Sequence, residues 1–180
     1  MILLPKHFRV HEGCYPHFIT NVVPHWIPIF SGEDYFRILV DTLTFCAANK
    51  GLLIHGYVLM PNHYHLLCSQ EDAKLSEVIR DMKGYTSRLI APKLREDGRL
   101  DWLRALTRRL ADGERISVWQ EEFHPEQVYS QPFFEQKLNY IHDNPVRAGF
   151  VEKVEDWKYS SAGFYYSDKP SPIPMTPIQW

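Results

Sequence analysis

The chain has 180 residues, a length that suits one domain rather than two. Its residues are 44% hydrophobic and 23% charged, the balance of an ordinary globular protein. The 3 cysteines show no Cys-x-x-Cys spacing, which argues against a disulfide scaffold and a thiolate zinc site and favours a cytoplasmic protein. No apolar stretch approaches the roughly 18 residues of a membrane span, so we expect no membrane partner.

The charge distribution leaves nucleic-acid binding open. A net charge of -2 is unlike that of a protein that binds nucleic acid with its whole surface. However, half of the 20 basic residues lie between Arg80 and Arg115. Within this segment Lys83 and Arg88 are candidate phosphate contacts, although a surface salt bridge is the commoner role of such residues. The segment could form a basic surface that binds DNA or the solvated face of a helix, and both interpretations stay open.

The first half of the chain predicts a strand, a helix and a hairpin. A run of β-formers ends at Pro24, and apolar residues then recur at helical spacing between a capping Ser31 and Gly51. Strand character returns on both sides of Pro61-Asn62, a pair typical of a turn. The predicted ranges are 17–23 for the first strand, 31–51 for the helix, and 52–60 and 63–68 for the hairpin.

The next segment predicts a helix, an insertion and a strand. The amphipathic helix covers residues 75–90 and breaks near Pro92, because proline disrupts a helix interior. The pattern of residues 93–115 predicts a polar helical insertion. Val118-Trp119 and residues 123–129 are the candidates for one more strand.

The last segment predicts one helix and an extended end. The helix begins near Gln131-Pro132, where proline is tolerated, and stops at Asn144-Pro145. After Gly149 we expect irregular chain. We therefore expect a single domain over residues 1–166 and a Pro-rich tail over residues 167–180.

The order of these elements predicts the fold class. Strand, helix, hairpin, helix, strand, helix is the order of a ferredoxin-like α+β fold. In this fold the helices cover one face of an antiparallel sheet. The other face of the sheet is then available for a site.

Two histidines of the predicted hairpin form a candidate metal site. On a strand, residues i and i+2 share one face, so the imidazoles of His63 and His65 can bind one ion. Tyr64 then points to the opposite face. A single His-x-His pair is a weak signal in a chain with 9 His, because such pairs are more often packing or surface residues.

Tyr140 and Asn144 lie four residues apart on the final helix, so the phenol hydroxyl and the amide oxygen can converge on one point. An amide and two neutral imidazoles make a low-charge site that suits Mn²⁺ or Mg²⁺ better than zinc. A free phenol has a pKa of about 10, so a tyrosine nucleophile must be deprotonated at a cost of about 4 kcal/mol at pH 7. The structural alternatives are a half-buried helix tyrosine and a helix exit at Asn-Pro.

Five segments of the chain resemble the single-tyrosine HUH transposases, and most closely the branch of REP-associated tyrosine transposases. The resemblance extends from about residue 15 to residue 166. The segments are Pro61-Asn62-His63-Tyr64-His65-Leu66-Leu67, Lys83-x-x-Thr86-Ser87, Trp119-Gln120, Tyr140-Ile141-His142-Asp143-Asn144-Pro145-Val146-Arg147-Ala148-Gly149 and Ser160-Ser161-Ala162.

The resemblance implies a fold, a reaction and a set of site residues. It implies the HUH endonuclease type of ferredoxin-like fold, with His63, His65 and Asn144 as ligands of Mg²⁺ or Mn²⁺. Tyr140 would be the nucleophile that takes the 5′-phosphate of cleaved single-stranded DNA and leaves a free 3′-hydroxyl. It also implies a homodimer that acts on single-stranded or hairpin DNA as a transposase.

Two other functions stay open at this point. The first is a non-catalytic regulator that binds hairpin DNA without cutting it. The second is a metal hydrolase of small molecules, which would need an acidic base near His65, where the next residues are Leu66 and Leu67.

Several other residues have two interpretations. Tyr85 is a rival nucleophile, but Leu89 stands four positions on, where a ligand is needed. Trp119 and Phe123 are candidates for stacking on bases or for core packing. His142 is expected to face away from Tyr140, because two residues turn a helix by roughly 200°.

Overall fold

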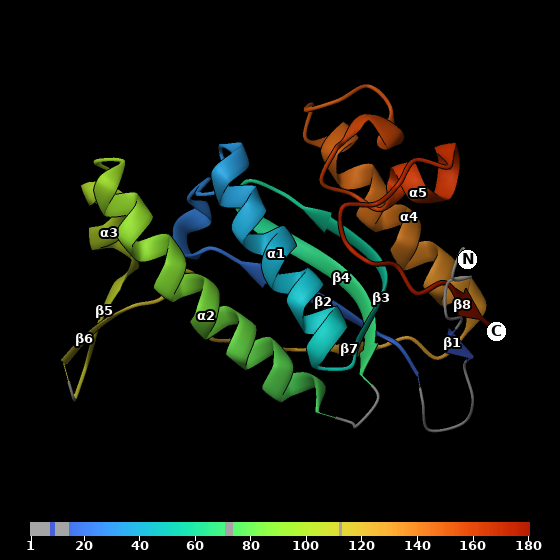
Figure 1. The fold of residues 1–180 in the computed structure, drawn as a ribbon, viewed down its shortest axis with the longest axis horizontal. Coiled ribbons are helices and arrows are strands. Elements are labelled where there is room, and N and C mark those ends of the chain that lie inside the picture. The colour runs from blue at the N-terminus through green and yellow to red at the C-terminus, as the bar shows by residue number, and fades with distance from the viewer. Residues whose placement is uncertain (1–7, 10–14, 71–73, 112) are drawn as a thin grey trace.

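The computed structural model describes residues 8–9, 15–70, 74–111 and 113–180 (Figure 1). The principal sheet contains β2 (His17–Val22), β3 (Leu52–Leu59), β4 (His63–Gln70) and β7 (Glu126–Gln127). The long helices are α1 (Glu33–Asn49), α2 (Leu75–Glu96) and α4 (Gln131–Arg147). The smaller elements are β1 (Phe8–Arg9), α3 (Leu100–Leu106), β5 (Thr107–Leu110), β6 (Gly113–Ile116), α5 (Ala162–Ser167), β8 (Ile178–Gln179) and the 3-10 turns Pro24–Trp26 and Val154–Asp156.

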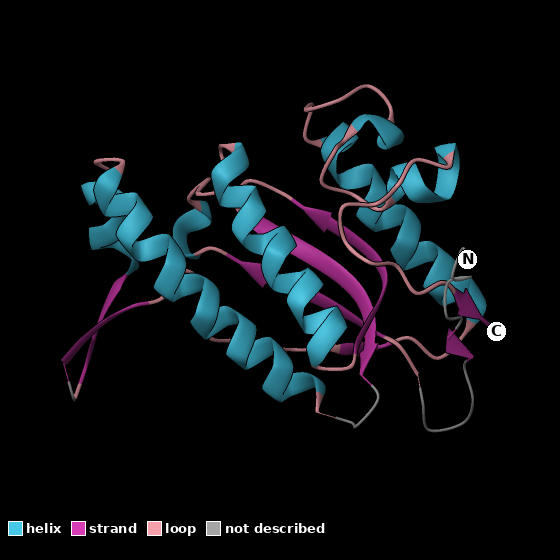
Figure 2. Cartoon of the chain, viewed as in Figure 1, coloured by secondary structure: helices cyan, strands magenta, loops and turns pink. Residues whose placement is uncertain are grey.

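The principal sheet confirms the ferredoxin-like prediction. Its strand order is β3-β4-β2-β7, and each neighbouring pair is antiparallel. Helices α1 and α2 cross in front of these strands in Figure 2 and pack on one face of the sheet. Helix α4 contacts β3 and β4 from the opposite face, so the expectation that all helices cover one face is corrected.

Side-chain alternation along β4 separates the two faces of the sheet. Tyr64 and Leu66 are fully buried in the large core beneath α1 and α2. Leu67 belongs to a second, smaller core with Leu138 and Ile141 of α4. Because residues i and i+2 share a face, His63 and His65 point to the same side as Leu67, toward α4.

The first strand, first helix and hairpin lie where the sequence predicts them, but α2 does not break at Pro92. It continues to Glu96 with Pro92 inside it. Ile90 and Leu94 are both fully buried and lie one turn apart, on either side of the proline. Their packing against the core holds the helix together and outweighs the loss of one backbone hydrogen bond.

The insertion at residues 93–115 is only partly helical, and this corrects the sequence prediction. After the end of α2 and the short α3, β5 and β6 form an antiparallel hairpin. Gly113 has φ +126, a conformation that side chains rarely adopt. The Asp112-Gly113 pair in the sequence is a hairpin signal that the helical interpretation overlooked.

The end of α4 also differs from the prediction. The helix runs through Asn144-Pro145 to Arg147, because Pro145 is buried in line with Ile141. The Ala148 N–H still donates to the Asn144 carbonyl at 3.0 Å. The chain leaves the helix at Gly149, where φ is +74.

The chain after Gly149 is more ordered than predicted. It forms α5, whose Ser161 cap accepts a hydrogen bond from the Tyr57 N–H of β3 at 2.9 Å. The same hydroxyl contacts His142 Nε2 on α4 at 2.8 Å, so it ties strand and helix together. His142 is buried in this contact, which confirms that it faces away from Tyr140.

The Pro-rich segment 167–180 packs beside β3. Ile173 is fully buried, the Thr176 N–H donates to the Ile54 carbonyl at 2.8 Å, and β8 pairs with β1 in parallel. Among the described residues, no helix is both long enough and apolar enough to span a membrane.

A buried histidine beneath this segment predicts that acid destabilises the fold. His55 occupies a bulge in β3, where its ring nitrogens contact Thr176 O at 2.7 Å and Ser69 Oγ at 2.9 Å. Burial lowers the pKa of His55 from 6.5 to about 4. The unfolded chain therefore binds a proton that the folded chain excludes, and stability present above pH 6.5 is lost as the pH falls toward 4.

The expected loss at His55 is up to about 3 kcal/mol of unfolding free energy. Urea unfolding at a series of pH values from 7.5 to 4 measures it. A His55→Gln variant should reduce this dependence, whereas substitution of the exposed His124 by Gln should leave it as in wild type. Equal pH profiles for wild type and His55→Gln would contradict the assignment.

Candidate active site

Strand β4 brings two imidazoles together on the sheet face that α4 covers. The ring centroids of His63 and His65 lie 4.9 Å apart, with their planes at 73°. His65 stands opposite Thr20 of β2 and Val58 of β3 in the strand register. The pair therefore lies in the middle of the sheet, where its spacing is fixed by backbone hydrogen bonds on both sides.

Each imidazole is held through its Nδ1 atom. His63 Nδ1 lies 2.7 Å from Asn62 Oδ1, and His65 Nδ1 lies 2.8 Å from Thr20 Oγ1. A carbonyl oxygen only accepts, so the Nδ1 proton of His63 is donated to Asn62 and the lone pair is on Nε2. A metal ligand that is oriented through its other ring nitrogen has this arrangement.

Both imidazoles are neutral at neutral pH, which is the form that binds metal. Burial lowers the pKa of His65 to about 3, with smaller contributions from His63 and the Lys137 ammonium. Burial also lowers the pKa of His63, and a hydrogen bond to the Asn144 side chain opposes this shift.

Helix α4 places Tyr140 and Asn144 over these imidazoles. The Tyr140 ring lies 5.3 Å from the His65 ring and 6.0 Å from the Phe18 ring, edge-on in both cases. The Asn144 Nδ2 group donates to the Tyr140 carbonyl at 2.8 Å, which leaves the amide oxygen for the His63 ring. All four residues singled out in the sequence thus meet within one chain.

The anchoring of α4 explains this convergence. Leu138 and Ile141 are buried against the sheet in the smaller core, on the side of the helix next to the site. Tyr140 itself is 41% exposed, so its hydroxyl remains accessible from solvent. The helix is therefore fixed by its apolar residues, and the phenol lies at the rim of the imidazole pair.

These residues fit a divalent ion that prefers mixed nitrogen and oxygen ligands. The described residues contain no group of three His, Cys, Asp or Glu side chains that could hold a metal. The third donor next to the imidazoles is instead the Asn144 amide. Such a set resembles the N,O sites of Mg²⁺ and Mn²⁺ more than a structural zinc site, which takes four ligands.

Two cations near Tyr140 were missed in the sequence. Lys137 Nζ lies 4.5 Å from the centre of the Phe18 ring and 2.6 Å from Glu126 Oε2 of β7. Arg147 Cζ lies 5.7 Å from the centre of the Tyr140 ring. The two residues stand three before and seven after Tyr140, on the same side of the helix, so helical periodicity could have found them.

The predicted DNA contacts Lys83 and Arg88 lie on α2. Lys83 is half-buried, and its Nζ contacts the carbonyl oxygens of Gln120 and Glu121 at 2.5 and 3.3 Å. Arg88 is exposed and lies over the Tyr85 ring, with Cζ 5.9 Å from its centre. Helix α2 covers the sheet face that the imidazoles do not share, so neither residue is part of the imidazole site.

The two aromatic candidates for base stacking, Trp119 and Phe123, both pack against the core. Trp119 is buried, its Nε1 donates to Thr86 Oγ1 at 2.8 Å, and it stacks on Phe30, so it is a core residue rather than a base-stacking one. Phe123 is partly buried against the same core.

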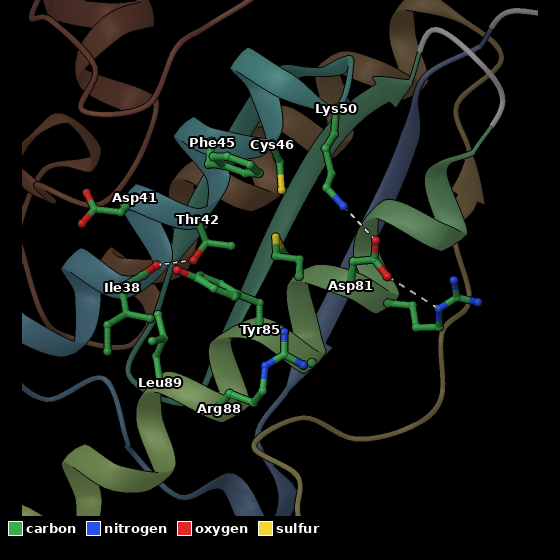
Figure 3. Close-up of a pocket in the computed structure, with 13 residues that line it drawn as sticks. Ile38, Asp41, Thr42, Phe45, Cys46, Lys50, Asp81, Tyr85, Arg88 and Leu89 are labelled. Atoms are coloured by element: carbon green, nitrogen blue, oxygen red, sulfur yellow. Dashed lines mark hydrogen bonds and ion pairs between the residues drawn. The ribbon is translucent and has the colours of Figure 1, made fainter.

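Tyr85, the rival nucleophile, lies in a groove of about 870 Å³ between α1 and α2 (Figure 3). Phe45 and Leu89 line this groove with it, and the Lys50 ammonium pairs with Asp81 at 2.8 Å at one end. The groove has no histidine and lies across the sheet from His63 and His65, so Tyr85 has no metal site beside it.

Comparison with known families identifies the class of protein to which this fold and site belong, a transposase. Residues 11–144 match the family described as "Transposase IS200 like", a range that extends to Asn144. This chain therefore belongs to the IS200-like transposase family.

Individual relatives point to the same group. A Haemophilus influenzae protein, provisionally named a REP-associated tyrosine transposase, is 27% identical over 105 residues. That match spans 57% of this chain and 54% of the relative, so the chain spans about half the length of the curated relative.

Two solved structures have a similar fold. A REP-associated tyrosine transposase bound to a REP hairpin has a TM-score of 0.63 at 18% identity, over 93% of this chain and 89% of that one. A Deinococcus radiodurans protein, provisionally named a transposase, has a TM-score of 0.50 at 16% identity, over 77% of this chain and 96% of that one.

Proposed function

We propose that this protein is a metal-dependent endonuclease and strand transferase of single-stranded DNA that acts through a 5′-phosphotyrosine. One observation carries the proposal: the Tyr140 ring, on α4, lies 5.3 Å from the ring of His65, next to its partner His63 on β4. A nucleophile and a neutral imidazole pair in contact are the parts that such a reaction needs.

The proposed reaction conserves the phosphodiester bond energy. The Tyr140 oxygen attacks the scissile phosphorus, a phosphorus–Oη bond forms, and the bond from phosphorus to the 3′-oxygen breaks. The phenol proton passes to solvent, and the leaving 3′-oxygen takes up a proton to become a free hydroxyl. Attack of another 3′-hydroxyl on the phosphotyrosine reverses these steps and joins the strands, so no nucleotide cofactor is needed.

The residues around the site have separate tasks in this proposal. His63, His65 and Asn144 would hold Mg²⁺ or Mn²⁺, which withdraws charge from the scissile phosphate when bound. Asn62 and Thr20 keep the ligand nitrogens of the imidazoles directed at that position. Lys137 and Arg147 would bind phosphates on either side of Tyr140.

The proposed DNA partner is a hairpin with a single-stranded flank, and the support is the likeness to a relative solved with a REP hairpin. A homodimer stays a proposal that sedimentation can test. The four site residues of one chain already meet, so each subunit would hold a complete site.

A labelled single-stranded oligonucleotide that carries the inverted repeat flanking the gene tests the proposal. With Mn²⁺ or Mg²⁺, we expect a protein–DNA adduct that survives boiling in detergent and disappears when EDTA is present. Hairpin binding that persists in EDTA, with no adduct in either metal, would contradict the nuclease and favour the non-catalytic regulator.

Lys137 offers a more local prediction. We expect Lys137→Gln to weaken oligonucleotide binding about equally for different sequences and to reduce the salt slope of the affinity by about one, because one phosphate contact is lost. Fluorescence anisotropy between 50 and 300 mM NaCl measures this. Lys153→Gln, at an exposed lysine outside α4, is the matched control, and an identical salt slope for both variants would rule out the contact.

A further inference from the structure

A strained turn lies beside the imidazole pair. His25 and Trp26, in the 3-10 turn Pro24–Trp26, have φ values of +59° and +56°. Non-glycine residues rarely adopt the left-handed region, and two in succession cost free energy that the surrounding structure must supply. Buried Val23 and Ile27 fix the two ends of the turn.

The turn exposes a tryptophan instead of burying it. Trp26 is 60% exposed, although tryptophan is among the side chains that gain most from burial. Its ring lies 5.8 Å from the His63 ring, edge-on at 74°. The turn therefore presents a large, flat ring at the surface, directly beside a proposed metal ligand.

One side chain couples this turn to the site. Asn62 Oδ1 accepts from His63 Nδ1 at 2.7 Å, and its Nδ2 donates to the Trp26 carbonyl at 3.3 Å. The Val23 N–H also donates to the Asn62 carbonyl at 2.8 Å. The same amide thus sets both the orientation of the imidazole and the position of the tryptophan.

The rings at the site follow one another in a defined order. Tyr140 contacts His65, His65 contacts His63, and His63 contacts Trp26, at 5.3, 4.9 and 5.8 Å between centroids. In an in-line displacement at phosphorus, the nucleophile and the leaving oxygen lie on opposite sides. Tyr140 and Trp26 contact different members of the imidazole pair, so attack on a bound phosphate from the Tyr140 end would place the leaving 3′-oxygen at the end where Trp26 lies.

We propose that Trp26 is a stacking platform for the base of the nucleotide that carries the leaving 3′-hydroxyl. The inference rests on the proposed function, because it takes Tyr140 as the nucleophile. Stacking on an aromatic ring tolerates any base and binds single-stranded DNA well. A platform there keeps the released 3′-end beside the phosphotyrosine, ready for the reverse attack.

Tryptophan fluorescence tests the stacking separately from cleavage. With dT12 as the probe and EDTA present, we expect quenching of wild-type emission that is largely absent in Trp26→Phe and retained in Trp180→Phe. We expect Trp26→Ala to bind dT12 at least about fivefold more weakly, with Trp26→Phe restoring most of the affinity. Equal quenching in Trp26→Phe and wild type would overturn the platform.

The position of the stacked base is tested by cleavage. On the flanking-repeat oligonucleotide, a stable abasic analogue immediately 5′ of the scissile phosphate should remove most of the difference in adduct formation between wild type and Trp26→Ala. The same analogue immediately 3′ of the phosphate should leave the difference intact. The reverse pattern, or no difference between the two proteins on the intact oligonucleotide, would reject this assignment.

The two proposals can fail separately. Adduct formation by wild type and by Trp26→Ala at equal rates would overturn the platform and keep the nuclease. No adduct from wild type in either metal would overturn the nuclease and with it the assignment to the leaving nucleotide. A sedimentation change in Trp26→Ala without a change in dT12 binding would mean that Trp26 contacts another protein chain, and this also overturns the platform.

Discussion

Tyr140→Phe should eliminate the covalent protein–DNA adduct and leave binding of the hairpin oligonucleotide within about twofold of wild type. The substitution removes one oxygen atom, which is the atom that would form the bond to phosphorus. The ring itself, with its contacts to His65 and Phe18, is retained. We expect cleavage to fall at least about a thousandfold, as when a catalytic nucleophile is removed.

Two other tyrosines supply matched controls for this experiment. Tyr85→Phe tests the rival nucleophile in the α1–α2 groove, and Tyr129→Phe removes the hydroxyl of a highly exposed tyrosine next to the start of α4. Both variants should form adduct like wild type. If Tyr140→Phe still forms adduct and Tyr85→Phe does not, the nucleophile has been assigned to the wrong face of the sheet.

His65→Ala should lower the rate of cleavage by more than about a hundredfold with Mn²⁺ and with Mg²⁺. The substitution removes a proposed metal ligand itself, not a residue that only orients a ligand. The same variant should lose the thermal stabilisation that Mn²⁺ gives to wild type. Melting curves with and without Mn²⁺ therefore report on the ligand without any need for cleavage. His124→Ala, at an exposed histidine, is the control.

Thr20→Val tests the orientation of the His65 ligand without removing the ligand or disturbing the fold. Valine has nearly the shape of threonine but cannot bond His65 Nδ1, which Thr20 Oγ1 contacts at 2.8 Å. We expect a 10- to 100-fold weaker apparent Mn²⁺ affinity, roughly the effect of losing a group that orients a ligand, with the metal-free melting temperature little changed. Unaltered Mn²⁺ affinity in both Thr20→Val and His65→Ala would show that Mn²⁺ does not bind at this site.

The sequence was most informative where a periodicity and a chemical type coincide. His63 and His65 share a face because strand side chains alternate, and Tyr140 and Asn144 are adjacent because helix residues four apart are neighbours. The element order likewise predicted the ferredoxin-like sheet. Each of these inferences needed only local geometry together with residue identity.

The errors at the two helix ends arose where tertiary packing overrides a local rule. Pro92 and Pro145 normally stop a helix, but Leu94 and Pro145 itself are buried, and core packing carries the helices past both positions. Trp26 could not be placed either, because nothing in the Pro24-His25-Trp26 sequence indicates left-handed backbone at two ordinary residues. Only the contacts of Asn62 and the buried turn ends make that conformation sufficiently stable.

The attachment of α4 limits how the proposed strand transfer can proceed. Helix α4, which carries Tyr140, is tied to β3 through the His142–Ser161–Tyr57 contacts and to the sheet through Ile141, all of them buried. Moving Tyr140 away from the imidazole pair would break these contacts and expose the apolar residues of α4 to water. In the proposed reaction the helix would therefore stay in place, and the nucleic acid would be the component that moves, with one 3′-end departing and its replacement arriving at a stationary phenol.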